Sequence, residues 1–308
     1  MIHAESICKT FEAPGSQVVR SLQNVSISVA DGSIYGLIGS NGSGKSTLMR
    51  VLSGIYQPDS GTIRYEGEPV WENTAVKQQI VYLSDDPYFL PHATMHDMKA
   101  FYQSLYPTFS EERYAALVEK FGLEPRRRIT TFSKGMQKQV SMLLGLSCRP
   151  QYMFCDETFD GLDPVMRQLV KSLIIEDVAE RNLCCVVASH NLREMEDMAD
   201  HIGLLHKGEL LFERELDDIR TNMVKVQVSY RKDECDRMAE KLRELQPSSL
   251  ERRGSLFTLI VRGSEEGLSP WFRETSPLFC EYIPMTLEEI FITEMEERGY
   301  EFTSQILG

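Results

Sequence analysis

The sequence predicts an α/β protein with a largely parallel sheet, followed by a smaller α+β unit. Three observations support this fold class. Short apolar strands alternate with helical segments between residues 33 and 208, a pattern typical of a parallel sheet with helices on its faces. A strand, a glycine-rich loop and a helix follow one another at residues 33–54. Beyond about residue 222 a second set of strands and helices begins.

The first part of the chain is expected to form strands around a single helix. Residues 1–11 and 18–29 alternate partly between apolar and polar side chains, which predicts two strands joined by a loop. Residues 33–39 read as a short apolar strand, and residues 45–54 as a helix that ends at Gly54. Further short strands are expected at residues 62–65 and 79–84.

A helical insertion is expected from about residue 88 to residue 131. Its segments 94–106 and 110–122 have helical spacing, and Thr94 and Ser110 are typical helix-start residues. Alternation then resumes, with strands expected at 151–157, 183–189 and 201–208 and helices at 164–182 and 191–200.

The domain boundary is placed after residue 218, which divides the chain into residues 1–218 and 219–308. The second domain is expected to be a small α+β unit, and it carries no chemical motif that we recognise. Its strands are predicted at 223–230, 256–263 and 278–284, and its helices at 232–245 and 286–299.

Composition narrows the classes of function. The chain has 46 acidic and 33 basic residues and a net charge of −13, which argues against a nucleic-acid partner, because phosphate backbones are bound by basic surfaces. The amino-terminal segment lacks the pattern of a signal peptide, and no apolar run approaches the roughly 18 residues of a membrane span. We therefore expect a cytoplasmic protein that reaches a membrane only as a peripheral subunit.

The cysteines indicate a reducing compartment. There are seven, an odd number, without C-x-x-C pairs or metal-like spacing, and several stand in apolar runs where cysteine behaves as a small hydrophobic residue. We expect none of them to be catalytic.

The segment "GSNGSGKST" at residues 39–47 matches the phosphate-binding pattern G-x-x-x-x-G-K-[ST]. Its position between a strand and a helix is the context that this motif requires. The residues expected to hold the phosphates are Gly39, Asn41, Gly42, Gly44, Lys45, Ser46 and Thr47. Kinases, GTPases, helicases and transporters can all carry such a loop, so other segments must decide among them.

The strand "YMFCDE" at residues 152–157 ends in two acids. After a phosphate loop, Asp156 is expected to reach a magnesium ion beside Ser46. Glu157 lies one residue further toward the γ-phosphate, where hydrolysis needs a group that orients or activates water.

The segment "FSKGMQKQV" at residues 132–140 distinguishes among these classes of nucleotide-binding protein. A small hydroxylated residue and a glycine precede a helix, so backbone N–H groups and the helix dipole face an anion. Here the sequence resembles the ABC ATPase family, whose signature is usually written L-S-G-G-Q. The resemblance implies a P-loop NTPase fold with a RecA-like core, an antiparallel β subdomain and a helical subdomain. It also implies that Ser133 and Gly135 contact the γ-phosphate of ATP held by a second subunit.

Other positions match the family pattern in the expected order. The segment "ETFDGLDP" implies a catalytic role for Glu157 and places Asp163 at a dimer interface. His190 in "VVASHN" resembles the switch histidine that bonds the γ-phosphate, and we assign it to the catalytic set. Phe11 matches the aromatic residue that stacks on adenine, although a lone strand aromatic is more often part of a core.

Two departures from the family pattern lie near the site. The Q-loop reads "LSDDP", so Asp85 stands where glutamine is usual in the family. A carboxylate can hold magnesium or its water. Asp85 is therefore expected in the metal site together with Ser46 and Asp156. The signature has Lys134 and Met136 in place of its second small residue and its glutamine. Signatures of this kind resemble those of exporter ATPases, including the bacitracin-resistance and drug-export group.

The resemblance implies that the chain is the ATP- and Mg²⁺-dependent ATPase subunit of a bacterial ABC transporter. The leading interpretation is that this transporter is an exporter. Two subunits would close around ATP, as a homodimer or heterodimer, and drive a separate membrane permease from its inner face. The insertion would be the docking region. Its aromatic residues, which form either the contact surface or the core of the insertion, are Tyr88, Phe89, Phe101 and Tyr102. The alternatives are a soluble ABC ATPase without a permease and an importer ATPase whose carboxy-terminal domain is regulatory.

Overall fold

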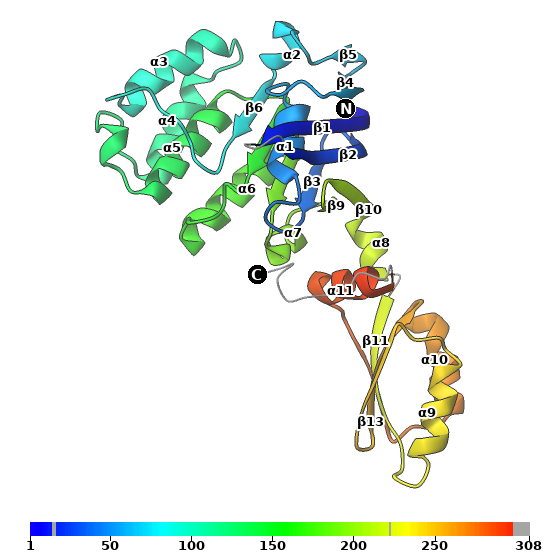
Figure 1. Ribbon diagram of the computed structural model, residues 1–308. Coiled ribbons are helices and arrows are strands. Elements are labelled where there is room, and N and C mark those ends of the chain that lie inside the picture. Colours follow the sequence, from blue (N-terminus) through cyan, green and yellow to red (C-terminus); the bar gives the residue numbers. More distant parts are fainter. Residues whose placement is uncertain (14–16, 222, 298–308) are drawn as a thin grey trace. The chain divides into compact units, whose positions relative to one another are not determined.

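The structure is a computed structural model that describes residues 1–13, 17–221 and 223–297. The chain divides into two compact units, residues 1–213 and the residues from Arg214 onward (Figure 1). The boundary expected from the sequence, after residue 218, falls inside helix α8 (Leu216–Thr221). Each unit is described by itself below.

The first unit begins with a four-stranded sheet in the order β2-β1-β4-β5. Strand β1 (Ile2–Ala13) is antiparallel to both β2 (Gln17–Val29) and β4 (Ser60–Tyr65), and the two-residue β5 (Glu68–Pro69) completes the edge. The partial alternation seen in the sequence has its expected cause, because the apolar side chains of Ile2, Ala4 and Ile7 are buried on one face.

A six-stranded sheet, β10-β9-β3-β8-β7-β6, forms the centre of this unit. Its strands β3, β6, β7, β8 and β9 pair in parallel, and every residue of β3, β7 and β8 is buried, as expected for strands covered on both faces. The strand bounds are β3 Ile34–Ile38, β6 Ile80–Leu83, β7 Tyr152–Asp156, β8 Cys184–Ser189, β9 His201–His206 and β10 Glu209–Glu215. The predicted α/β fold is confirmed.

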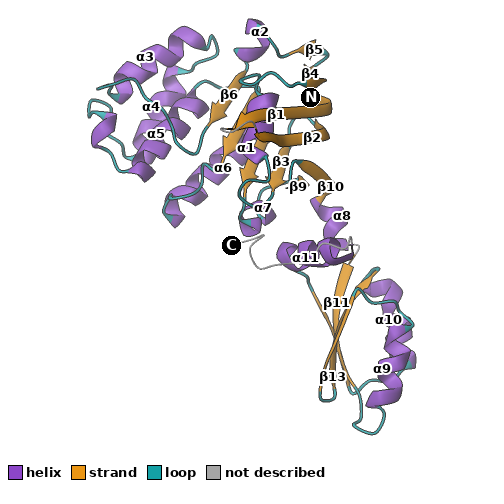
Figure 2. Cartoon of the chain, in the orientation of Figure 1, coloured by secondary structure: helices purple, strands orange, loops and turns teal. Residues whose placement is uncertain are grey.

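Helices cover this sheet and form the insertion (Figure 2). Helix α1 packs against β7 and β8, α5 against β6, and α6 and α7 against β8. The bounds are α1 Lys45–Leu52, α2 Thr74–Lys77, α3 Met95–Leu105, α4 Glu111–Phe121, η1 Ile129–Thr131, α5 Lys134–Ser147, α6 Pro164–Arg181 and α7 Leu192–Glu196. Helix α7 ends four residues before the predicted end at residue 200.

The insertion is helical, as predicted. Helices α3 and α4 begin after Thr94 and Ser110, whose side chains accept hydrogen bonds from the N–H groups of Asp97 and Arg113. A buried ion cluster ties the insertion to α6: the Asp177 carboxylate accepts from the Arg113 guanidinium at 2.6 Å and from Arg181 at 2.9 Å. The carboxylate of Asp177 is 1% exposed, so the insertion is joined to the sheet-bearing core by a desolvated contact.

The second unit is an antiparallel sheet in the order β12-β13-β11-β14, with helices. Its core includes Val226, Val228, Phe257, Leu259 and Phe272. The element bounds are β11 Met223–Ser229, α9 Cys235–Arg243, β12 Ser249–Arg253, β13 Leu256–Arg262, α10 Glu265–Glu274, β14 Phe279–Ile283 and α11 Leu287–Glu297. The last part of the helix predicted to residue 299 lies outside the described residues.

The sequence did not predict three elements of the second unit, namely α8, β12 and α10. Strand β12 reads "SLERR" and lies at the edge of the sheet. Its three charged residues are exposed, so the segment lacks the apolar alternation by which strands are predicted. Helix α10 contains Gly267 and Pro270, which read as helix breakers, although Ser264 caps its first turn by accepting from the Gly267 N–H.

All seven cysteines are free thiols, and burial raises the pKa of Cys184 to about 12, which leaves that thiol protonated and unreactive. Among the helices of residues 1–13, 17–221 and 223–297, none has both the length and the apolar character needed to cross a bilayer.

Candidate functional site

The glycine-rich loop connects β3 to α1 and ends at Gly44. This glycine has a φ of 110°, and a Cβ atom there would lie 2.6 Å from the carbonyl oxygen of Ser21. Only glycine fits this conformation and this close approach. The Leu48 N–H then donates to the Gly44 carbonyl at 2.9 Å and starts the helix. The loop backbone therefore faces the amino-terminal end of α1, where free N–H groups attract anions.

A cavity of about 300 Å³ lies over this loop. It is polar, and it brings together residues of the loop, the Q-loop segment and the end of β7. Its lining residues are Ser21, Asn41, Gly42, Gly44, Lys45, Ser46, Thr47, Asp85 and Glu157. Eight of these nine were predicted as site residues, so the cavity collects most of the set that the sequence indicated.

Lys45 is held inside this site. Its side chain is 4% exposed, and its Nζ donates to the carbonyl of Gly39 at 2.7 Å and to that of Ser40 at 3.2 Å. The same Nζ lies 3.2 Å from a carboxylate oxygen of Glu157. The Lys45 ammonium and the Glu157 carboxylate thus neutralise each other within the protein.

Asp156 lies behind the loop and is 2% exposed. Its Oδ1 accepts from the Ser46 hydroxyl at 3.0 Å, and its Oδ2 accepts from the Tyr82 hydroxyl at 2.6 Å. Burial and the neighbouring Asp156 carboxylate raise the pKa of Tyr82, so this phenol stays a donor. Ser46 and Asp156 present two adjacent oxygen atoms, which is the donor type that Mg²⁺ prefers.

Glu157 follows β7 with a φ of 49°, in the left-handed region that is unusual for a residue with a side chain. Its N–H donates to the Ala188 carbonyl at 3.0 Å, which fixes the backbone against the end of β8. This conformation turns the side chain into the cavity, where one carboxylate oxygen contacts Lys45. Strained backbone of this kind is often found at functional sites.

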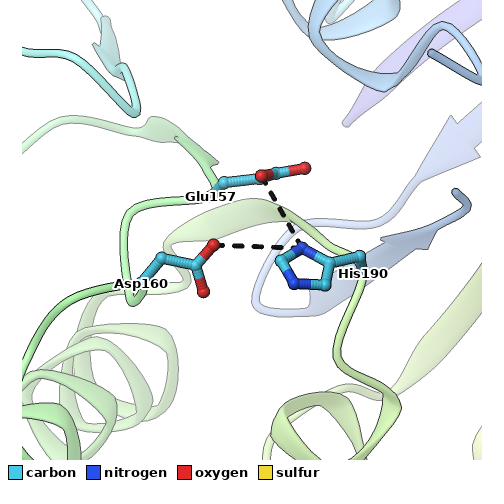
Figure 3. A group of neighbouring side chains, drawn as sticks. All are labelled: Glu157, Asp160 and His190. Carbon is cyan, nitrogen blue, oxygen red and sulfur yellow. Dashed lines mark ion pairs between the residues drawn. The ribbon is translucent and has the colours of Figure 1, made fainter. Parts of the chain in front are cut away.

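His190 lies beside Glu157 and Asp160 (Figure 3). Its Nδ1 is 3.7 Å from the Glu157 Oε2 and 3.9 Å from the Asp160 Oδ2, distances too long for hydrogen bonds, although a protonated imidazole would form ion pairs with these carboxylates. One ligand atom from each of the three residues lies within 4.8 Å of the other two. The structure therefore brings both predicted catalytic residues to one place and adds Asp160, which the sequence analysis had not selected.

The segment after His190 is anchored to α6. The carboxylate of Glu194 is 4% exposed; it accepts from the Ser189 hydroxyl at 3.0 Å and lies 3.3 Å from the Arg167 guanidinium. The Asn191 N–H donates to the same Ser189 hydroxyl at 2.9 Å. These contacts fix the short turn that carries His190.

Asp85 lines the cavity, and its Oδ1 accepts from the Nζ of Lys138 at 2.6 Å. Its carboxylate is 60% exposed, so water and a cation can reach it. Lys138 belongs to α5, and this pairing has no local signature in the sequence because 53 positions separate the two residues.

The signature residues do not line this cavity. Ser133 caps α5 by accepting from the Met136 N–H at 3.2 Å. Gly135 lies close to Gly161, and a Cβ atom on Gly135 would be 2.8 Å from the carbonyl oxygen of Gly161. Asp163 caps α6 by accepting from the N–H groups of Val165 and Met166 at 3.0 Å. Both caps leave helix amino termini that can face an anion or another protein.

Phe11 lies on β1 and is 37% exposed. Its ring meets Tyr56 edge to face, with ring centroids 5.6 Å apart, and the Nζ of Lys9 is 5.5 Å from its centroid. The ring is therefore neither a buried core residue nor a residue that lines the cavity.

Comparison with known proteins agrees with these features. The ABC transporter family matches residues 22–160. The ABC transporter ATP-binding protein YtrB of Bacillus subtilis (strain 168) is 31% identical over 294 residues, which cover 96% of this chain and 98% of that protein. This chain belongs to the family of ABC transporter ATP-binding proteins. It is therefore an ABC ATPase with an ATP site, and the predicted family is confirmed.

Other relatives of this ABC cassette match over a shorter range. The bacitracin transport ATP-binding protein BcrA of Bacillus licheniformis is 32% identical over 213 residues, covering 67% of this chain and 68% of that protein. A solved structure of an ATP binding subunit of an ABC transporter has a TM-score of 0.65 and 26% identity, and the match covers 71% of this chain and 92% of that one. The shared part accounts for the cassette fold.

Proposed function

We propose that this ABC ATPase is the motor subunit of a bacterial exporter and works with a separate permease on the inner face of the cell membrane. The observation that carries the proposal is the cavity that joins the phosphate loop, Lys45 and Glu157. Support for a transport role comes from relatives named bacitracin transport and lantibiotic transport ATP-binding proteins, and the proposal of export rests on the resemblance of the signature segment to those of exporter ATPases.

In this proposal the loop binds the phosphates of ATP through its backbone N–H groups and Lys45. Phosphate must compete with Glu157 for the Lys45 ammonium, so nucleotide binding would release the Glu157 carboxylate toward the γ-phosphate. Phe11 would offer its exposed ring to adenine. The phosphate-binding residues are Gly39, Asn41, Gly42, Gly44, Lys45, Ser46 and Thr47.

The oxygen atoms of Ser46 and Asp156 fit Mg²⁺, and Asp85, which lines the same cavity as Ser46, would hold the ion or its water. When bound, Mg²⁺ supplies charge that offsets the developing charge on the phosphates. Tyr82 fixes the orientation of the Asp156 carboxylate by donating to its second oxygen.

Glu157 would orient the attacking water and accept its proton, and His190 would bond the γ-phosphate. Asp160 and Glu157 flank the Nδ1 of His190, which leaves the other side of the ring for phosphate. The Lys45 contact occupies one oxygen of the Glu157 carboxylate until nucleotide arrives.

Ser133 and Gly135 would act on ATP held by a second subunit, since neither lines the cavity of its own chain. The second subunit is either another copy or a different ATPase. Asp163 would lie at the interface between the two.

The permease would dock on the insertion. Tyr88 is 79% and Phe101 is 41% exposed, which suits a contact surface. Tyr102 and Phe89 are both half-buried, and burial raises the pKa of Tyr102 to about 12. The predicted aromatic set therefore divides into two exposed and two half-buried residues.

A Glu157→Gln variant tests hydrolysis and dimer closure together. The amide keeps the shape of the side chain but removes the base, so the hydrolysis rate should fall on the order of 10²–10⁴-fold, with ATP binding retained. The variant should accumulate as an ATP-bound dimer on gel filtration with ATP and Mg²⁺. Adding Ser133→Arg should abolish that dimer.

Glu180→Gln is the matched control, because Glu180 is exposed on α6 and remote from the cavity lining. It should hydrolyse ATP at the parental rate. Parental activity in Glu157→Gln would refute the catalytic assignment, whereas a monomer with bound ATP would favour a different ATPase partner.

A further inference from the structure

Lys138 contacts two segments of the site although it does not line the cavity. Its Nζ donates to the Asp85 carboxylate at 2.6 Å and to the backbone carbonyl of Glu157 at 3.2 Å. The side chain is 12% exposed and lies in the second turn of α5. One ammonium group thus joins the Q-loop segment, the helix that follows Ser133 and the residue proposed to activate water.

The contact with Glu157 supports a strained backbone. At the φ of 49°, the carbonyl of Glu157 turns toward α5, and the Lys138 ammonium compensates its partial negative charge. The same carbonyl also accepts from the Asp160 N–H, at 3.4 Å, a weaker contact. Lys138 therefore helps to hold Glu157 in the conformation that places its carboxylate in the cavity.

The contact with Asp85 affects the charge of the cavity. Asp85, Asp156 and Glu157 contribute three carboxylates near the phosphate loop, and Lys45 and Lys138 contribute two ammonium groups. Without Lys138 the Asp85 carboxylate would repel the phosphates of ATP. Mg²⁺ would remove that repulsion, because it can take the place of the ammonium beside Asp85.

We propose that Lys138 is a positioning residue with two separable effects: it holds the backbone of Glu157 for hydrolysis, and it neutralises Asp85 until Mg²⁺ takes its place. The proposal rests on the function proposed above. It predicts that Mg²⁺ and Lys138 compete for the Asp85 carboxylate. Mg²⁺ should therefore tighten ATP binding more strongly when Lys138 is removed.

The test is a double-mutant cycle with two measurements. The first is the ratio of the ATP dissociation constant in EDTA to that in Mg²⁺, obtained by calorimetry. Lys138→Met should raise this ratio roughly fivefold, the effect of one partly exposed ion pair. In an Asp85→Asn background the same substitution should change the ratio by less than about twofold, because the repelling charge is absent.

The second measurement is kcat at saturating ATP and Mg²⁺, which reports the Glu157 contact. Lys138→Met should lower kcat about tenfold, the effect of losing one charge-assisted hydrogen bond, and it should do so with or without Asp85→Asn. Lys138→Arg keeps a cation beside Asp85 and should keep the binding ratio within about twofold of the parental value. Lys120→Met, at an exposed lysine of α4, controls for the loss of one positive charge.

An unchanged binding ratio in Lys138→Met, or the same rise in both backgrounds, would overturn the Asp85 half of the proposal. An unchanged kcat would overturn the Glu157 half. Lys138→Gln replaces Lys138→Met if the latter fails to fold, as judged by its melting curve. If the parental protein binds ATP without hydrolysing it, the proposed function fails, yet the binding ratio still decides whether Lys138 and Mg²⁺ compete for Asp85.

Discussion

Replacing Asp177 by alanine should destabilise the first unit by about 3 kcal/mol, because it leaves two arginines without their shared partner. Breaking a buried ion pair typically costs about 3–5 kcal/mol. The Asp177 carboxylate is 1% exposed, but the side chains of Arg113 and Arg181 are 20% and 14% exposed. Water can therefore reach part of each guanidinium after the substitution, which places the expected loss at the lower end of that range.

Thermal unfolding of the nucleotide-free protein measures this loss. For a unit of this size about 3 kcal/mol corresponds to a fall in Tm of roughly 6–12 °C. Asp197→Ala is the matched control, since Asp197 contacts Lys171 at 3.3 Å but is 71% exposed. Its substitution should cost less than about 1 kcal/mol.

Equal falls in Tm for Asp177→Ala and Asp197→Ala would refute the reasoning, because Asp177 is buried between two arginines whereas Asp197 is exposed and contacts one lysine. A fall confined to Asp177→Ala would show that the insertion depends on its ion cluster for attachment to α6. That attachment matters for the proposed function, since force from a permease would pass from the insertion to the cavity.

Two further predictions concern the surface of the first unit. Tyr88→Glu should reduce co-fractionation with membranes that contain the permease while leaving ATP hydrolysis in solution unchanged; unaltered membrane binding would exclude this tyrosine from the docking surface. Asp59→Asn should lower Tm at neutral pH, because hydrogen bonds from Lys9 and Thr10 lower the pKa of Asp59 from 3.8 to about 2. Stability from a lowered pKa is present above 3.8 and is lost as pH falls toward 2, so the difference in Tm between the two proteins should shrink across that window. A difference independent of pH would contradict this origin.

The parts of the site that the sequence could predict are those made by neighbouring residues. The loop at residues 39–47, the strand that ends at Asp156 and the helices that begin after Ser133 and Asp163 each depend on a short segment whose backbone geometry follows from its residue types. The central parallel strands were equally clear, because burial on both faces demands continuous apolar runs.

The parts that could not be predicted depend on long-range contacts or mixed local signals. Tyr82 donates to a carboxylate 74 positions away, and Lys138 pairs with one 53 positions away, so no window of sequence contains both partners. Helix α10 forms around Pro270 because its apolar face, including Phe272, packs into the core of the second unit. In that helix tertiary packing outweighs local propensity.

The left-handed conformation of Glu157 sets limits on engineering this protein for heat resistance. Glycine and asparagine adopt a φ of 49° more readily than glutamate does, so substitution by either should relieve strain in the folded protein. A library selected for thermostability alone would favour variants without the carboxylate if this relief exceeds the loss of the ion pair with Lys45. Catalytic activity and thermal stability would then favour different residues at position 157. Selection experiments need to measure ATP turnover as well as resistance to heating.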